Sequence, residues 1–388
     1  MGQARERNGS KMLSGIENLG AFAISHILPF IFVLTIVVFF HELGHFLVAR
    51  RVGVKVKTFS VGFGPELLGF TDRKGTRWRL SWIPLGGYVK FLGDENEVGR
   101  TDWAAVNALP PEERAESFPA KSVGRRAAIV AAGPLANFIL ALVIFTAVFS
   151  IFGRQEMTPR VDTVVAGSAA EKAGIRPGDM IVAIDGHHVA DFSDLQRVVT
   201  VSAGTELTLT VNRDGQQLAI LLTPELKEIS DGFGNKHKVG VLGITRNTAD
   251  RVLKTYSVPE AAGLALSETW FVVERTVTYL AGIVAGRESA DQLGGPIRVA
   301  EVSAQVATIG IVALINLAAI LSISIGLINL VPVPMLDGGH LLYYAVEAVR
   351  GRPLSERAQE IGFRIGFVAV VALMIFATWN DIIHLSSL

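Results

Sequence analysis

Two histidines and a glutamate stand together in the pentapeptide His41-Glu42-Leu43-Gly44-His45, and these residue types at this spacing can bind a metal. Residues four apart lie on one face of a helix, so both imidazoles can reach one ion. Glu42 lies beside them, where a carboxylate can take a proton from a water activated by the metal. The pentapeptide has the H-E-x-x-H pattern of zinc proteases, which predicts metal-dependent peptide hydrolysis.

A simpler alternative is that the histidines only mark the interfacial end of a membrane helix, with Glu42 in solvent. The apolar run Ile31–Phe40 directly precedes the motif. Ionisable residues at the end of a hydrophobic helix are costly unless they are paired or bound to something. Three of them within five positions therefore favour the metal site.

Four long runs without charged residues indicate an α-helical membrane protein with about four transmembrane helices. The chain has 388 residues, 50% of them hydrophobic, and the charge-free runs are Asn18–Phe40, Ala127–Gly153, Val302–Leu336 and Ile365–Asn380. About 20 apolar residues span a bilayer, so each run except the shorter fourth is long enough by itself. The fourth extends through Ile361–Phe363.

Composition excludes several other classes of protein. The formal net charge is zero and no basic stripe with interleaved aromatic residues occurs, so nothing indicates nucleic-acid binding. The chain has no cysteine, which excludes disulfides, cysteine metal sites and thiol catalysis.

The distribution of positive charge predicts which end of the first span carries the motif. Residues 1–18 form a polar leader with a few basic residues, and no cleavage site follows, so we expect the first run to be a retained span. Between Ala49 and Ala127 there are 14 Lys and Arg against 9 Asp and Glu. The positive-inside rule makes this loop cytoplasmic, despite the basic leader, and places the motif near the cytoplasmic face.

The same loop carries apolar, glycine-rich stretches at Val61–Pro65 and Trp78–Lys90. Their alternation predicts short strands and turns that return toward the membrane. Two interpretations stay open: an edge strand that pairs with an extended substrate, or a surface hairpin.

Residues 154–245 have the composition of a soluble domain on the opposite side of the membrane from that loop. We expect strands at 161–165, 180–184, 206–211 and 217–222, a hairpin turn at Asp185-Gly186 and a helix at 193–199. The following segment, 246–300, is predicted to hold an interfacial helix at 259–286, because three charged residues disfavour a span there.

Two prolines must break the third charge-free run near its end. Pro332 and Pro334 each remove a backbone donor and clash with the preceding turn. The run crosses toward the side of the first motif, which places Asp337 as a third metal ligand. The alternative is that Asp337 caps a helix beginning near Gly339, and capping does not exclude ligation. Asn137, within the second span, must find a partner, and contact with the first span is favoured.

Together these motifs resemble those of the site-2 protease family of intramembrane zinc proteases. The resemblance rests on the first pentapeptide and on Asn329…Pro332-Val333-Pro334-Met335-Leu336-Asp337-Gly338, in the family's order. Residues 167–186 resemble a PDZ domain, and a PDZ domain between the second and third spans is typical of the regulator of sigma-E protease branch. Only one PDZ-like unit is visible, whereas some members carry two, and Val239–Ile244 is a candidate for its permuted strand.

The resemblance implies one zinc ion per chain, held by His41, His45 and Asp337, with Glu42 as general base. It implies that Asn329 contacts the substrate backbone and that a membrane-embedded sheet around Phe63, Gly86 and Tyr88 holds the substrate extended. It also implies a bacterial inner-membrane protein with a periplasmic PDZ-like domain. The implied substrates are single-span membrane proteins of the anti-sigma-factor type, and remnant signal peptides.

The predicted fold is therefore a polytopic α-helical membrane protein with a membrane-associated β-hairpin or sheet and an inserted α+β PDZ-like domain. Its expected divisions are a leader (1–18), two spans with the cytoplasmic loop (19–153), the PDZ-like domain (154–245), a helical segment (246–300) and the last two spans (301–388). Two rival functions are a non-catalytic scaffold acting through the PDZ-like domain and an ion transporter. The second disagrees with a second span that lacks acidic residues and histidines.

Overall fold

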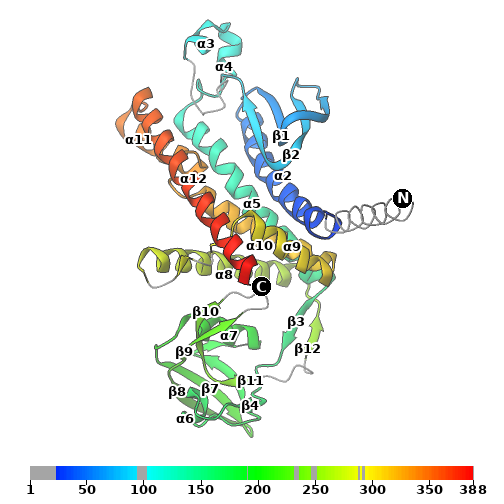
Figure 1. The fold of residues 1–388 in the computed structure, drawn as a ribbon, viewed down its shortest axis with the longest axis vertical. Coiled ribbons are helices and arrows are strands. Elements are labelled where there is room, and N and C mark those ends of the chain that lie inside the picture. Colours follow the sequence, from blue (N-terminus) through cyan, green and yellow to red (C-terminus); the bar gives the residue numbers. More distant parts are fainter. Residues whose placement is uncertain are drawn as a thin grey trace, which may run out of the picture. The chain divides into compact units, whose positions relative to one another are not determined.

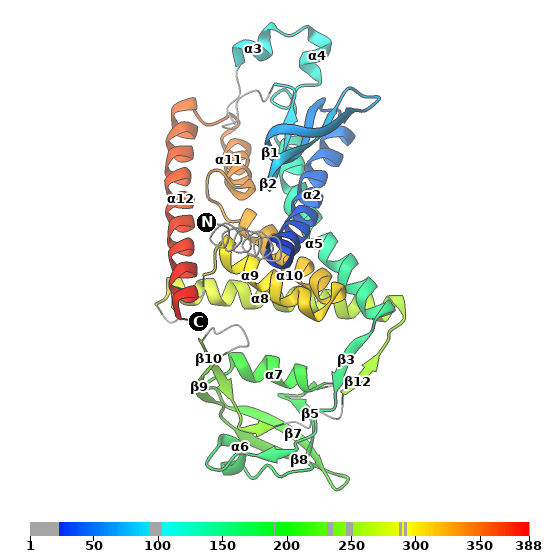
Figure 2. The ribbon, with the colours of Figure 1, turned by 45° about the vertical axis from the view of Figure 1, so that its right-hand side comes forward.

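The computed structural model describes residues 23–93, 103–189, 191–230, 236–245, 251–286, 289–290 and 293–387. The chain divides into two compact units (Figures 1 and 2). The helical unit combines Met1–Ala147 with Val258–Ser387, and the second unit is Val148–Ser257. The predicted leader at 1–18 lies outside the described residues.

The four predicted spans are confirmed as four helices long and apolar enough to cross a membrane among the described residues. They are α2 (Leu28–Arg51), which continues the π-helical turn Ala23–Ile27, α5 (Val123–Ile151), α10 (Ile311–Asn329) and α12 (Glu356–Ser387). The first span ends where Gly53 takes a φ of 78°, a conformation that closes helices and favours glycine. Arg50 and Arg51 in its last turn suit the negative end of the helix dipole.

Small residues bring the spans close together around the histidine motif. A side chain on Gly44 of α2 would overlap the backbone of Ala132 in α5. In lipid there is little hydrophobic force between helices, so such close van der Waals contacts are a main source of their association. Farther along α2, Val33 packs against Leu314 and Ala318 of α10.

The third charge-free run has 35 residues, which is too long for one simple crossing, and it does not form a single helix. It divides between α9 (Pro296–Ile309) and α10, which are separated by Gly310 with a φ of 133°. The chain then leaves helical geometry from Leu330 to Leu336, across both prolines, and resumes as α11 (Asp337–Arg350). Asp337 is the first residue of α11 and Leu336 is its N-cap residue, so the capping alternative for Asp337 was wrong.

Two other helical segments complete this unit. The predicted interfacial helix is α8 (Val258–Val284), which is not among the four candidate spans. It lies across the direction of the neighbouring spans (Figures 1 and 2). The short helices α3 (Trp103–Ala108) and α4 (Pro111–Ala115) lie in the loop before α5.

The predicted strands of that loop are β1 (Val56–Thr71) and β2 (Arg77–Phe91), which pair with each other. The pair is irregular, and Val61 stands opposite both Gly87 and Leu80. One end packs on α2, where Phe59 is buried beside Phe46 and Ala49. The rest exposes large apolar side chains, namely Phe63, Leu67, Leu68, Phe70, Leu80, Trp82, Ile83 and Leu85.

The second unit is built around a four-stranded sheet with the order β6-β5-β7-β8. The strands are β5 (Met180–Ile184), β6 (His187–His188), β7 (Leu207–Arg213) and β8 (Gln216–Leu222). The turn between β5 and β6 has positive φ at Asp185 and Gly186, as the hairpin signal required. Helix α7 (Phe192–Val201) begins with a capping box formed by Asp191 and Asp194.

Smaller pairs of strands surround this sheet: β9 (Glu225–Ser230) with β10 (Lys236–Val241), and β11 (Ile244–Thr245) with β4 (Thr163–Val164). Helix α6 (Ala169–Lys172) follows β4, and Ile181, Leu195 and Leu209 are fully buried in the shared core. Each such burial contributes about 1.5–3 kcal/mol.

Both ends of the second unit extend beyond the predicted range of 154–245. Strand β12 (Arg251–Lys254) returns to pair with β3 (Arg154–Met157), so part of the segment predicted as helical is a strand. The predicted single stretch Val239–Ile244 is divided between β10 and β11, because Gly243 has a φ of 79°. Long-range pairing of this kind leaves no signal in local periodicity.

Candidate metal centre

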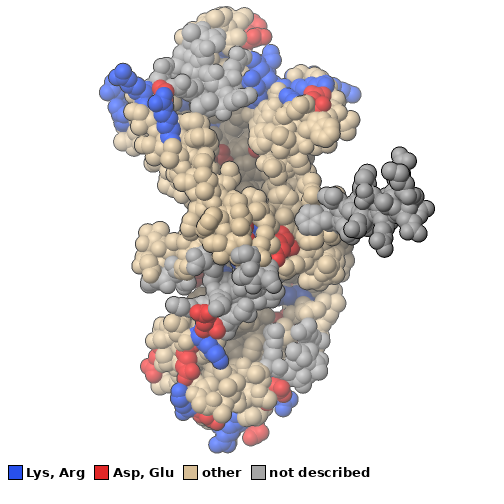
Figure 3. All heavy atoms as spheres, viewed as in Figure 1, with Lys and Arg blue, Asp and Glu red and all other residues tan. Residues whose placement is uncertain are grey.

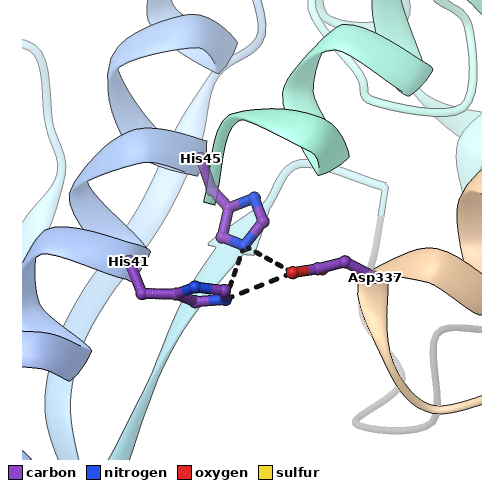
Figure 4. Close-up of side chains that lie close together, drawn as sticks. All are labelled: His41, His45 and Asp337. Atoms are coloured by element: carbon purple, nitrogen blue, oxygen red, sulfur yellow. Dashed lines mark hydrogen bonds and ion pairs between the residues drawn. The ribbon is translucent and has the colours of Figure 1, made fainter. Parts of the chain in front are cut away.

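Three potential metal ligands converge from two parts of the chain that lie almost 300 residues apart (Figure 4). His41 and His45 share one face of α2, and Asp337 reaches them from the first turn of α11. One oxygen of Asp337 lies 3.2 Å from Nε2 of His41 and 3.6 Å from Nε2 of His45. The two Nε2 atoms are 3.3 Å apart.

The donor set fits zinc. Two imidazole nitrogens and a carboxylate oxygen are a common set of protein ligands for a catalytic zinc site, which leaves a fourth position for water. A tetrahedral ion about 2 Å from each ligand would separate the ligands by about 3.3 Å, close to the spacing observed. The carboxylate oxygen facing the histidines is buried without a hydrogen bond among the described residues, as expected of an atom placed for a metal.

The other ring nitrogens of both histidines contact α5. Nδ1 of His45 lies 2.9 Å from the carbonyl oxygen of Ile129, and Nδ1 of His41 lies 3.2 Å from the amide nitrogen of Asn137. Asn137 is fully buried, and its contact with His41 of α2 confirms the prediction that it meets the first span. Sequence reasoning missed Ile129, because a backbone carbonyl gives no residue-type signal.

The backbone of β2 covers Glu42. A side chain on Gly87 would lie 2.9 Å from Cγ of Glu42 and 2.9 Å from Val38, so only glycine allows this approach. Sequence reasoning did not assign Gly87 to the site, although it lies beside the predicted Gly86. Gly86 itself has a φ of 149° and lies against the ring of Phe63.

The other predicted substrate contacts have defined positions. The rings of Phe63 and Tyr88 stack with centroids 6.2 Å apart, and the Tyr88 hydroxyl accepts a hydrogen bond from Arg79. Asn329 is the last residue of α10 and is half-buried. Their roles toward a substrate stay predictions.

The sequence pattern of peptidase family M50 matches residues 29–373, which include all three ligands. The chain belongs to peptidase family M50. The match covers most of the chain, so this M50 peptidase is a zinc metalloprotease, in agreement with the triad. It is also a membrane protein with several spans, in agreement with the four apolar helices.

Relatives of this M50 peptidase carry corresponding names. It is 51% identical to "Putative zinc metalloprotease Atu1380" of Agrobacterium fabrum, over 93% of this chain and 96% of the relative. It is 38% identical to "Metalloprotease MmpA" of Caulobacter vibrioides, over 91% of this chain and 94% of the relative. These similarities decide between an enzyme and the two rival functions, the scaffold and the transporter, in favour of the enzyme.

Proposed function

We propose that this enzyme cleaves peptide bonds within the transmembrane segments of single-span membrane proteins. The observation that carries the proposal is the location of the triad. His41 and His45 lie on α2, a candidate span, and Asp337 follows the end of α10, another span, by eight residues. A site built from spans meets its substrate inside the membrane.

The described side chains have defined roles in this reaction. His41, His45 and Asp337 hold zinc, which when bound lowers the pKa of a water molecule and polarises the scissile carbonyl. Glu42 is the general base: it takes a proton from the attacking water and then gives it to the amine nitrogen as the C–N bond breaks. Glu42 directly follows His41 on α2 and lies three residues before His45, and this position between the two histidines supports the role.

The hairpin β1–β2 holds the substrate extended. A transmembrane helix hides its carbonyls in intrahelical hydrogen bonds, so it must unwind before it can be cleaved. Pairing with a strand edge would satisfy the freed backbone groups. The contact of Gly87 with Glu42 supports β2 as that edge, with Phe63, Gly86 and Tyr88 close by and Asn329 as a further substrate contact.

Charge distribution supports a site near the cytoplasmic face of the membrane, which we propose to be a bacterial inner membrane. The visible face of the helical unit is largely uncharged along its spans, and Lys and Arg gather at the end that carries α11 and the β1–β2 hairpin (Figure 3). Arg50, Lys74 and Arg350 are among the basic residues of this end. By the positive-inside rule this end is cytoplasmic. The chain then crosses the membrane once more, through α5, before the second unit begins, so we propose that the second unit is periplasmic.

The second unit serves as a single PDZ-like domain that selects substrates. Its order of elements, with the short helix α6 after β4, the longer helix α7 between β6 and β7, and β11 returning to pair with β4, supports a permuted PDZ arrangement. Trimmed anti-sigma factors and remnant signal peptides are the substrate classes that fit such a filter. It acts either by binding new C-termini or by excluding bulky domains.

The test is cleavage of a single-span substrate by purified enzyme in detergent, with the cut located by mass spectrometry. Glu42→Gln is expected to lower the rate on the order of a thousandfold or more while one zinc per chain remains bound. Glu112→Gln, an exposed substitution on α4, is the matched control. Full activity of Glu42→Gln, or cuts only outside the transmembrane segment, would contradict the proposal.

A further inference from the structure

Helix α5 supplies no member of the triad, yet one of its faces contacts every element that does. Arg126, Ile129, Gly133 and Asn137 recur every three or four residues along it. At 3.6 residues per turn they lie within about 80° of one another around the helix axis. A continuous stripe of α5 therefore faces the metal centre.

The contact between this stripe and His41 determines which nitrogen of the His41 ring carries the proton. A histidine that binds a metal through Nε2 carries its proton on Nδ1, and that N–H needs an acceptor. The amide nitrogen Nδ2 of Asn137 lies 3.2 Å from Nδ1 of His41. The backbone of Asn137 is held in place because the Ser322 hydroxyl donates a hydrogen bond to its backbone carbonyl at 2.9 Å. Because the Asn137 amide nitrogen can only donate, Nδ1 of His41 must be the acceptor in this orientation. The proton of a neutral His41 ring is then on Nε2, the nitrogen that faces the other ligands.

A half-turn of the amide reverses this arrangement. Oδ1 of Asn137, which is buried without a hydrogen bond among the described residues, then accepts from Nδ1–H and leaves the lone pair of Nε2 for the metal. His45 is already held in that tautomer, because the Ile129 carbonyl can only accept. Gly133 leaves room for the His45 ring, which a side chain there would overlap.

The same stripe holds the helix that carries the third ligand. Arg126 donates to Glu347 of α11 at 2.6 Å, and both side chains are mostly buried, at 15% and 13% exposed. The guanidinium also lies 4.9 Å from the centroid of the Tyr344 ring, on the same helix. Asp337 begins α11 ten residues earlier, so this ion pair fixes the far end of the helix whose first turn reaches the histidines.

We propose that Asn137 and Arg126 are positioning residues of the metal centre: Asn137 orients His41 for binding through Nε2, and Arg126 holds α11 so that Asp337 reaches the ion. The inference rests on the proposed role of the triad as zinc ligands. Helix α5, which contributes no metal ligand itself, then has the function of holding the ligands in place. Neither residue touches the reacting atoms.

The first test measures zinc affinity of the full-length enzyme in detergent by competition with a chelator. Asn137→Leu has a similar volume but no acceptor, and it is expected to weaken zinc binding about 10- to 100-fold. Asn137→Asp keeps an acceptor for Nδ1–H and is expected to stay within about threefold of the wild type. A role in packing alone predicts the reverse order, because it would penalise the buried charge and tolerate leucine.

His41→Ala is the reference that separates this inference from the proposed function. If His41→Ala loses zinc while Asn137→Leu binds it as the wild type does, the positioning role is overturned and the ligand assignment stands. If His41→Ala keeps zinc, the ligand assignment itself fails. The absorption spectrum of the cobalt-substituted protein adds a second readout, since a displaced His41 changes the ligand field of the ion.

The second test exchanges the charges of the ion pair, and it does not depend on the buried Asn137 site. Arg126→Glu and Glu347→Arg are each expected to weaken zinc binding about fivefold, and the double variant to restore it. Arg125→Glu, at an exposed position on the adjacent residue, is the matched control and should leave the affinity unchanged. No rescue in the double variant, or equal losses from Arg125→Glu, would overturn the role of Arg126.

Discussion

Asp179 in the second unit is a buried carboxylate and Asp337 in the helical unit is a mostly buried one, but their neighbours give them different functions. Asp179 is 1% exposed and accepts hydrogen bonds from the Arg213 guanidinium at 2.7 and 2.8 Å and from the backbone of Arg176 at 2.9 Å. Asp337 is 16% exposed and faces the imidazoles of His41 and His45. Arginine is always a cation and donor, whereas a neutral imidazole also offers a lone pair.

The difference shows what makes a buried acid structural and what makes it a ligand. The Arg213 hydrogen bond holds the pKa of Asp179 below its usual value. The negative charge of Asp179 is thus balanced by a side chain of the protein, and the carboxylate needs no metal ion. At Asp337 three potential electron-pair donors meet within 4.8 Å, and a metal ion held there would balance them.

The largest expected effect is that of Asp337→Ala. Removing one of three ligands should reduce bound zinc from one per chain to near zero and lower proteolysis on the order of a thousandfold or more. Metal analysis of the purified variant together with a cleavage assay would check both. Zinc content equal to that of the wild type would remove Asp337 from the ligand set.

Asp179→Ala should have the opposite profile. It leaves Arg213 without its partner and is expected to destabilise the second unit by about 3 kcal/mol, at the low end for a buried pair because Arg213 is 20% exposed. Zinc content should stay at one per chain. Unfolding measured by denaturant, alongside metal analysis, checks the contrast, and a loss of zinc without a loss of stability would refute it.

Gly133→Ala tests how tightly the histidine side of the site is fitted. The added methyl group would overlap the His45 ring, which must then move, so zinc affinity should fall about tenfold or more. Gly124→Ala, on the same helix with nothing within 4 Å of the new Cβ, is the control. Equal zinc affinities of the two variants, measured by chelator competition, would contradict this fit.

The smallest expected effect is the pH dependence contributed by Asp179. Because its folded pKa lies below the ordinary 3.8, the stabilisation is complete above about pH 4 and is lost as the pH falls through the lowered pKa. The difference in the free energy of unfolding between the wild type and Asp179→Asn should therefore shrink by at most about 1 kcal/mol between pH 6 and pH 3. A constant difference would show that the charge of Asp179 does not contribute.

The elements with a strong local pattern were predictable from the sequence. The four spans follow from charge-free runs, and the hairpin turn of the second unit from Asp185-Gly186. The break before Asp337 follows from Pro332 and Pro334. Each of these depends on residues close together in the chain.

Elements that depend on distant partners were not predictable in the same way. The return of β12 to β3 joins residues about 95 positions apart, and nothing local to either strand predicts that pairing. The contact of Gly87 with Glu42 requires the hairpin to be packed on α2. Backbone approach of this kind selects glycine, but glycine also occurs in ordinary turns.

The sequence by itself determined the chemistry: two histidines one helical turn apart, a glutamate beside them, and an aspartate after a proline-broken span. The tertiary structure alone decided that these groups meet, and that α5 lies behind them with Asn137, Ile129 and Arg126 toward the site. The physical reason is that helical periodicity fixes residues within about one turn, whereas long-range contact depends on packing between helices.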